Sequence, residues 1–341
     1  MRKTNLWPLI FGFWGMLVVI LDGKTAVSGV RDGLELCLST LIPSLFPFFV
    51  LSSLITSSLA GHPIGVLQSV CRFCRMGSGA ESFLAVGILG GYPVGAANIA
   101  GAAAKGLLSE KEAQRLTVFC NNAGPSFLFG MLGPLFPDQR WAWLLWAIQI
   151  AASLLTGFLL PGGSTEPIAP TKSHTASLSE CLNRSIKSMV LVCGWVVLFR
   201  MILGFLQRWI LWLFPSPVQI ILTGLLELAN GCLALSGIKS TNLLFLLAAV
   251  MLSMGGICVW MQTKAVFPQL KLSRYILGRI LHCIICFLLS LLMLPLLSGI
   301  RWDSAAAVLM IVGIVGLFLI FTLRKWKKAV AFYNSMMYNG V

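Results

Sequence analysis

The stretch 82–130 constrains the fold more than any other, because two long apolar segments in it are interrupted by residues that break helices. The first interruption is Gly90-Gly91-Tyr92-Pro93-Val94-Gly95, and the second is Asn121-Asn122-Ala123-Gly124-Pro125-Ser126. Proline removes a backbone donor and glycine lowers helix propensity, yet backbone groups inside lipid must still find hydrogen-bond partners. Interruptions therefore belong where backbone lines a cavity, which in secondary transporters is often the substrate site. We predict a polar site at mid-membrane built from these two interruptions.

Composition places the chain in the membrane. Of its 341 residues, 57% are hydrophobic and only 11% are charged, whereas a soluble domain carries about 25% charged residues. The apolar runs do not alternate in the way that β-barrel strands do. At about twenty residues per span, they predict an all-α, polytopic membrane protein of about ten segments, located in the cell membrane with the lipid bilayer around it.

The positive charge has a topological explanation. A formal net charge of +14 would suggest a nucleic-acid ligand in a soluble protein. Here Lys and Arg crowd short loops and the cluster Arg324-Lys325-Trp326-Lys327-Lys328, as the positive-inside rule describes for cytoplasmic loops. We therefore predict a cytoplasmic basic tail and no nucleic-acid partner.

The chain divides into two halves that resemble each other weakly. Gly90-Gly91-Tyr92-Pro93-Val94 matches Gly255-Gly256-Ile257-Cys258-Val259, and the linker 106–109 matches 269–273 in the same order. Chance similarity between apolar helices is the alternative, and the sequence does not decide between inverted and parallel repeats. The predicted organisation is a first spanning helix (1–32), repeat 1 (33–160), a Pro-, Ser- and Thr-rich linker (161–179), repeat 2 (180–300), and a last spanning helix with a basic tail (301–341).

Polar residues of the second half extend the predicted site. Glu227 lies in an apolar segment, where a carboxylate is costly unless it faces protein or water or is protonated. Its functional role would be to contact the substrate or to bind a coupling proton. The alternative is a structural ion pair with Arg200 or Arg184. Asn230 lies three residues on, on the same helical face, and Gln262 joins them if the second half mirrors the first.

The interruptions of the first half supply the other candidates. Asn121 and Asn122 offer more amide groups than one helix break needs, although they could instead satisfy backbone freed by the break. Ser126 begins the following half-helix, whose free amides favour an anion. Tyr92 could stack on an aromatic substrate or donate a hydrogen bond, or it could be an interface tyrosine.

Enzyme and metal chemistry have no pattern in this sequence. It contains no Walker motif, no HExxH helix and no nucleophile elbow. The pairs Cys71-x-x-Cys74 and Cys283-x-x-Cys286 have no second matching pair or histidine cluster nearby, so we interpret them as small hydrophobes within helices. We predict no catalytic residues, no metal ligands and no cofactor.

Three motifs carry a family resemblance. The segments 35–47, 91–95 and 121–130 resemble the YlbJ family of sporulation integral membrane proteins, also known as SpoVV, whose members carry two "nucleoside recognition" Gate domains. In the second half, Gly224-Leu225-Leu226-Glu227 and Ser253-x-Gly255-Gly256 are similar to the matching motifs. The resemblance runs from about Gly33 to Arg279. Cys258-Val259-Trp260 departs from it, because a more polar run with a histidine is expected there.

The resemblance implies a function in endospore-forming bacteria. It implies a secondary transporter that moves dipicolinic acid, a small anionic aromatic substrate, out of the mother cell across the outer forespore membrane. The domain name keeps open a nucleoside or nucleobase transporter of the same architecture. A non-transporting membrane scaffold or gate subunit is the third hypothesis. A coupling proton or cation and a homo-oligomer are open partners that the sequence does not decide.

Overall fold

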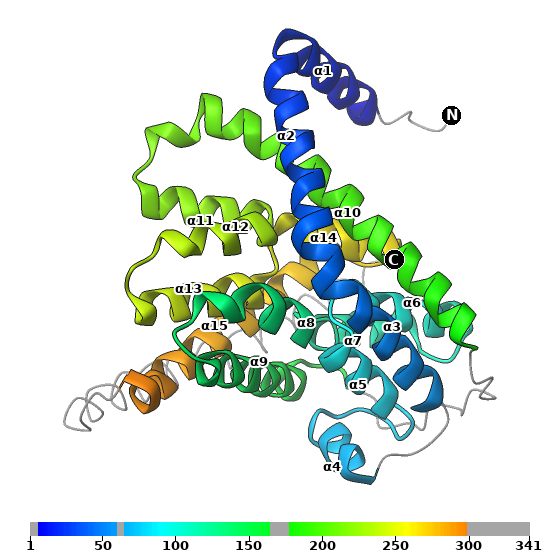
Figure 1. Cartoon of the computed structure of the whole chain (residues 1–341). Coiled ribbons are helices and arrows are strands. Elements are labelled where there is room, and N and C mark those ends of the chain that lie inside the picture. Colours follow the sequence, from blue (N-terminus) through cyan, green and yellow to red (C-terminus); the bar gives the residue numbers. More distant parts are fainter. Residues whose placement is uncertain (1–5, 60–64, 164–176, 299–341) are drawn as a thin grey trace, which may run out of the picture. The chain divides into compact units, whose positions relative to one another are not determined.

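The structure is a computed structural model that describes residues 6–59, 65–163 and 177–298 (Figure 1). Secondary structure within these ranges is helical throughout, so the predicted all-α class is confirmed for them. The predicted last spanning helix and tail (301–341), and most of the predicted linker (164–176), lie outside the described residues. The chain forms two compact units, Met1–Phe287 and Leu288–Val341, and the packing and site described below belong to the first unit.

The helices follow one another along the chain with short connections. In order they are α1 Trp7–Leu21, α2 Gly23–Leu36, η1 Cys37–Leu41, α3 Ile42–Leu59, α4 Gly65–Phe73, α5 Glu81–Leu89, α6 Val94–Ala104, α7 Glu110–Phe119, α8 Pro125–Phe127, η2 Leu128–Leu132, η3 Gly133–Leu135, α9 Gln139–Leu159, α10 Leu178–Trp209, η4 Leu211–Leu213, α11 Ser216–Leu226, α12 Leu228–Ala234, η5 Leu235–Gly237, α13 Thr241–Met254, α14 Gly256–Val266 and α15 Leu272–Ser298.

Among the described residues, five helices are long and apolar enough, by length and composition, to cross a membrane. They are Gly23–Ile55, Gln139–Leu159, Leu178–Trp209, Thr241–Val266 and Leu272–Pro295. Shorter apolar helices of 10–17 residues accompany them, at Leu9–Leu21, Val94–Ala104, Pro125–Leu135, Ser216–Leu226 and Leu228–Gly237. The membrane class is thereby supported, whereas the predicted count of about ten segments stays a prediction.

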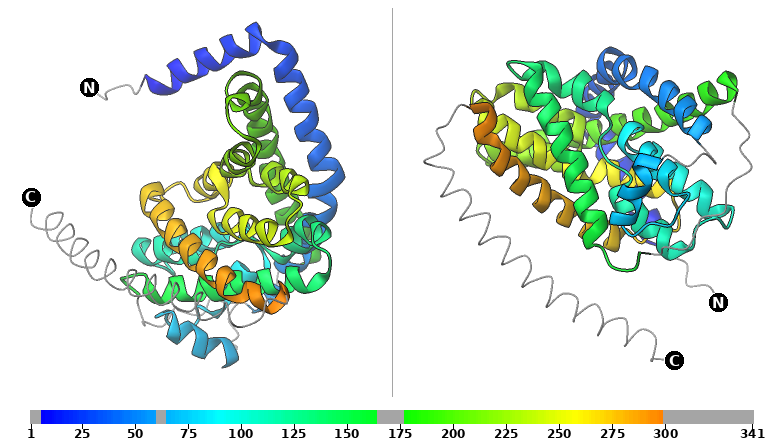
Figure 2. Two further views of the ribbon diagram at one scale, coloured as in Figure 1. Left: turned by 90° about the vertical axis from the view of Figure 1, so that its left-hand side faces the viewer. Right: turned by 90° about the horizontal axis from the view of Figure 1, so that it is seen from below.

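Two long helices, α2 and α10, pack closely side by side (Figures 1 and 2). A Cβ atom added to Gly29 would lie 2.7 Å from the Cα of Met201, and one added to Gly33 would lie 2.9 Å from the Cα of Val197. The spacing Gly-x-x-x-Gly therefore lets the two backbones approach, as small residues do between membrane helices.

Two ion pairs fix the direction of the α2–α10 contact. Arg200 donates to Asp32 at 2.7 Å, and Arg208 lies 3.3 Å from Asp22. Because the residue nearer the start of α2 pairs with the residue nearer the end of α10, the two helices run antiparallel.

Four apolar segments within the described residues are interrupted, two in each half. The interruptions lie between α5 and α6, α7 and α8, α11 and α12, and α13 and α14. Each half thus reads as a long helix, two interrupted segments and another long helix. By this order, the interruption at Gly90 corresponds to the one at Glu227, and the interruption at Asn121 corresponds to the one at Gly255. The sequence match instead aligned Gly90 with Gly255. The repeat itself stays a prediction.

Glycines allow the interrupted segments to pack backbone against backbone. A Cβ on Gly87 of α5 would lie 2.5 Å from the carbonyl oxygen of Cys120, and one on Gly95 of α6 would collide with the same oxygen. Both arms of the first interruption therefore rest on the second. In the other half, Gly224 and Gly231 meet across the turn at Glu227, so α11 and α12 form a helical hairpin (Figure 1).

One arginine joins the interruption of α7 to that of α13. Arg279 of α15 is completely buried. One terminal nitrogen donates to the carbonyl oxygens of Val118 and Asn121, at 3.3 and 3.4 Å. The other donates to those of Leu252, at 3.4 Å, and Ser253. These carbonyls lie at or just beyond the last turns of α7 and α13, where a helix leaves its acceptors unpaired.

The charge of Arg279 is balanced by backbone rather than by an acid. No carboxylate in the described ranges forms an ion pair with it. The carboxyl ends of α7 and α13 carry partial negative charge, and two such ends face the same guanidinium.

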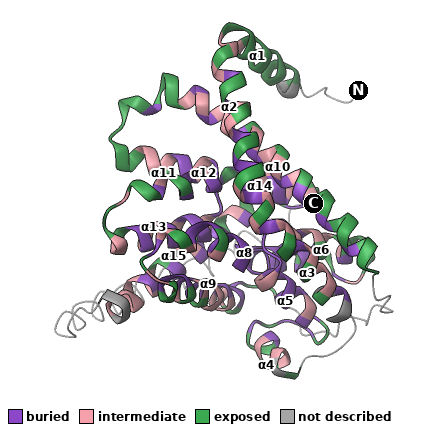
Figure 3. Cartoon of the chain, in the orientation of Figure 1, coloured by how far each residue is buried: buried purple, intermediate pink, exposed green. Residues whose placement is uncertain are grey.

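Figure 3 shows that α8 and the neighbouring parts of α5 and α13 are largely buried, whereas α1 is mostly exposed.

The glycine contact gives a first prediction. Gly33→Val should lower the free energy of unfolding by about 2 kcal/mol, because the side chain overpacks against α10. Gly194→Val is the matched control, since a Cβ at Gly194 meets no atom within 4 Å. The measurement is the midpoint of thermal unfolding of the purified protein in detergent. Equal midpoints for the two variants would contradict the close α2–α10 packing.

The arginine gives a second prediction. Arg279→Met should cost about 3 kcal/mol or more of stability, because it leaves buried carbonyls without donors. Arg274→Met, on an exposed position of the same helix, should cost little. Thermal unfolding in detergent compares the two. A small loss for both would show that the carbonyls are satisfied without Arg279.

Candidate functional site

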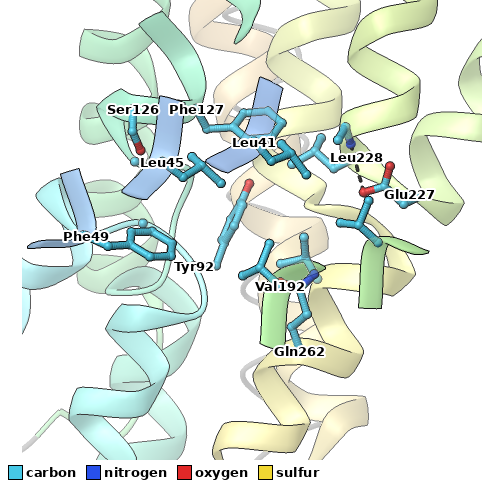
Figure 4. A pocket seen from close by; sticks show the side chains of 16 residues that line it. Leu41, Leu45, Phe49, Tyr92, Ser126, Phe127, Val192, Glu227, Leu228 and Gln262 are labelled. Atoms are coloured by element: carbon cyan, nitrogen blue, oxygen red, sulfur yellow. Dashed lines mark hydrogen bonds between the residues drawn. The ribbon is translucent and has the colours of Figure 1, made fainter. Parts of the chain in front are cut away.

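A cavity lies where three of the interruptions meet η1, α3, α10 and α14. It is lined by residues of the α5–α6, α7–α8 and α11–α12 interruptions, by η1 and α3, by α10 and by α14: Leu41, Leu45, Phe49, Gly90, Gly91, Tyr92, Gly124, Ser126, Phe127, Val192, Val196, Glu227, Leu228, Ala229, Val259 and Gln262. Figure 4 shows the Tyr92 ring in the middle of these side chains. An apolar cavity with a few converging polar groups is typical of a small-molecule site.

Four of the predicted site residues line this cavity, and three do not. Tyr92, Ser126, Glu227 and Gln262 come from four different elements or connections and line one space. Asn121, Asn122 and Asn230 are absent from the lining. Both first-half interruptions therefore contribute residues to the cavity lining. Asn121 and Asn122 instead bond to residues outside the lining.

Tyr92 links the cavity to the end of α13. Its hydroxyl donates to the carbonyl oxygen of Leu252 at 3.0 Å, one of the two α13 carbonyls that also accept from Arg279. The hydroxyl is therefore engaged, and the ring face is the part of Tyr92 offered to the cavity. A ring in this position suits stacking against a planar aromatic ligand.

Asn121 ties three helices together. Its amide nitrogen donates to the hydroxyls of Thr263 at 3.1 Å and Tyr275 at 3.4 Å, and its oxygen accepts from the backbone of Ala96 at 3.2 Å. Asn122 is equally engaged. Its nitrogen donates to the carbonyl oxygen of Phe119 at 2.7 Å and to Ser153 at 3.1 Å, and its oxygen accepts from Arg279 at 2.9 Å. Both amides thus hold the interruption in place.

Ser126 and Gln262 have hydrogen-bonding capacity to spare. Neither the hydroxyl of Ser126 nor the side-chain oxygen of Gln262 bonds to any residue in the described ranges, and the Gln262 nitrogen donates only to the sulfur of Cys258, at 3.3 Å. Thiol sulfur is a weak acceptor. These two side chains are therefore the polar groups of the cavity most available to a ligand.

Glu227 fills the single-residue connection between α11 and α12. It is 2% exposed, and its carboxylate caps α12 by accepting from the backbone of Ala229 and Asn230. The ion pair with Arg200 that the sequence left open is not present, because Arg200 pairs with Asp32. Arg184, the other suggested partner, is exposed on α10.

The walls and the support of the site were not visible in the sequence. Leu41, Leu45 and Phe49, with Val192 and Val196 of α10, supply apolar lining of the cavity, and such residues look like those of any lipid-facing helix. Arg279 does carry a usable signal, since a lone arginine within an apolar span must find a partner.

The described residues offer no metal site. No group of three or more His, Cys, Asp or Glu side chains in those ranges is placed to hold a metal ion, and the ten cysteines are free thiols.

The cavity is narrow. The space within it that is open to water-sized molecules measures ≈ 30 Å³. A water molecule needs about 10–15 Å³ on this measure, so the space suits about two. A ligand larger than this requires the walls to separate.

Comparison with known proteins gives one distant similarity. The chain is 24% identical over 314 residues to "Sporulation integral membrane protein YlbJ" of Bacillus subtilis (strain 168), covering 77% of this chain and 76% of that protein. No model of a protein family matches the chain, and no solved structure matches it. The similarity supports the family that the motifs indicated, and the predicted Gate domains stay a prediction. With its apolar helices, the similarity supports a multi-pass membrane protein.

Proposed function

We propose that this chain is a secondary transporter of a small aromatic carboxylate, with dipicolinic acid as the substrate, and that it acts in sporulation. The proposed step is export from the mother cell across the outer forespore membrane. The observation that carries the proposal is the cavity on which three helix interruptions converge. Interrupted helices around a central site are the architecture by which many secondary transporters bind substrate.

The composition of the cavity supports an aromatic ligand with polar edges. The ring of Tyr92 and the apolar walls can contact a planar ring, while Ser126 and Gln262 can bond to its polar substituents. The distant relative is described as a sporulation integral membrane protein, which supports the cellular process but specifies no substrate.

A nucleoside is the second candidate, and Glu227 is the observation that favours it. This acid is the charged side chain of the lining in the described structure, and a carboxylate is a good acceptor for ribose hydroxyls. A neutral nucleoside would meet no charge repulsion there. A nucleoside would therefore bind best when Glu227 is ionised, whereas an anionic substrate would be repelled by the ionised carboxylate.

Uptake by purified protein in liposomes tests the function. We expect labelled dipicolinate to accumulate in protein-containing vesicles above protein-free vesicles, and excess uridine to leave this uptake unchanged. Uptake of labelled uridine instead of dipicolinate would establish the nucleoside alternative. Uptake of neither compound, by protein shown to be folded, would favour the scaffold or gate subunit that the sequence left open.

The cavity gives a third prediction. Gln262→Ala should lower the initial uptake rate by roughly tenfold, because one hydrogen bond to the substrate is lost. The matched control is Gln139→Ala, at an exposed position at the start of α9, which should transport like the unmodified protein. Equal uptake by both variants would place the substrate elsewhere in the molecule.

A further inference from the structure

The charge of the cavity is confined to one side chain. Within the described structure, Glu227 is the only Asp, Glu, Lys, Arg or His that lines it. Arg200, the cation that interacts electrostatically with Glu227, forms an ion pair with Asp32 at 2.7 Å. Figure 4 shows Glu227 at the edge of the space that Tyr92 occupies. A ligand in this cavity therefore meets a negative charge, and no cation in the described ranges lines the cavity with it. Arg279, which interacts electrostatically with Tyr92, lies outside the lining.

The carboxylate is held by neutral donors. Oε1 accepts from the backbone nitrogen of Ala229 at 3.1 Å. Oε2 accepts from the backbone nitrogen of Asn230 at 2.6 Å and from its side-chain nitrogen at 2.7 Å. An ionised carboxylate has about four acceptor positions, and three are filled. Oε1, with a single donor, is the oxygen with room for a proton.

The other titratable groups near Glu227 do not supply a compensating charge. They are the thiols of Cys37 in η1, Cys232 in α12 and Cys258 in α14, which interact electrostatically with the carboxylate, and the hydroxyl of Tyr92 across the cavity. All four are neutral as acids and become negative when they lose a proton. None of them can offset the charge of a bound anion.

An anionic substrate therefore faces like-charge repulsion in a site shielded from water, where such repulsion is strong. Protonation of Glu227 removes it and leaves a neutral acid that can donate a hydrogen bond. A divalent cation would need a ligand cluster that the described residues lack.

We propose that Glu227 carries a coupling proton, so that a substrate anion occupies the cavity together with a proton on this residue and both cross the membrane. This inference rests on the proposed transport function. In each cycle the proton comes from water on the side where the substrate binds, adds to Oε1, and leaves to water on the other side. No bond of the substrate changes.

The first test uses the unmodified protein. Liposomes loaded with a pH-sensitive dye in weak buffer should acidify inside when dipicolinate is added outside, and protein-free vesicles should not. A pH gradient that is acidic outside the vesicles should raise the initial rate of dipicolinate uptake about tenfold over the rate at equal pH. Substrate entry without acidification would overturn the proposed coupling to a proton and leave the proposed transport function standing.

The second test uses variants. For each one, uptake under the pH gradient is divided by uptake at equal pH. The ratio should fall to about one for Glu227→Gln and stay near tenfold for Glu35→Gln, an exposed acid outside the cavity. A ratio near tenfold for Glu227→Gln would overturn the role of this residue.

The remaining outcomes separate the two proposals. Uptake driven by a sodium gradient at equal pH, with no effect of the pH gradient, would overturn coupling to a proton. It would leave the proposed transport function standing. Absence of dipicolinate uptake under every condition would instead remove the proposed function itself. If Glu227→Gln shows no uptake under either condition, acidification by the unmodified protein still supports coupling to a proton, and its absence overturns that coupling.

Discussion

The buried guanidinium of Arg279 is the interaction on which the interrupted helices depend. Two interrupted segments, one from each half, end in carbonyls that lipid cannot satisfy, and one side chain donates to both sets. The cost of burying the cation is offset by the two helix ends that face it. This arrangement also keeps the positive charge out of the cavity, which leaves Glu227 as the charge that a ligand encounters.

The polar residues around the interruptions divide into supporting and lining groups. Asn121 and Asn122 bond to α6, α9, α14 and α15, and they keep the interruption open by replacing its lost backbone bonds. Ser126 and Gln262 keep unused capacity beside the cavity. A substitution at Asn122 would therefore lower stability before it reported on binding, and Gln262 is the sharper probe of the site.

Much of this arrangement could be predicted from local sequence, and the remainder depends on contacts between distant segments. Gly and Pro revealed the interruptions at Gly90 and Asn121, and an acid in an apolar run singled out Glu227. The α11–α12 hairpin was not predicted, because a lone Glu227 between apolar residues does not signal a turn. The role of Arg279 was also missed, since its acceptors lie 26 to 161 residues away and no local pattern encodes them.

The position of the cavity indicates which parts must separate to admit a substrate. On one side, α2 and α10 are joined by Gly29, Gly33 and two ion pairs, and they extend into the apolar wall formed with η1 and α3. On the other side, Arg279 joins the interrupted α7 and α13. Each group is tied internally by contacts that are costly to break, and the cavity lies between the two. We therefore expect opening to occur along this boundary, because the cavity lining there, such as Leu45 and Val192, is apolar and can separate without leaving a buried polar group unpaired.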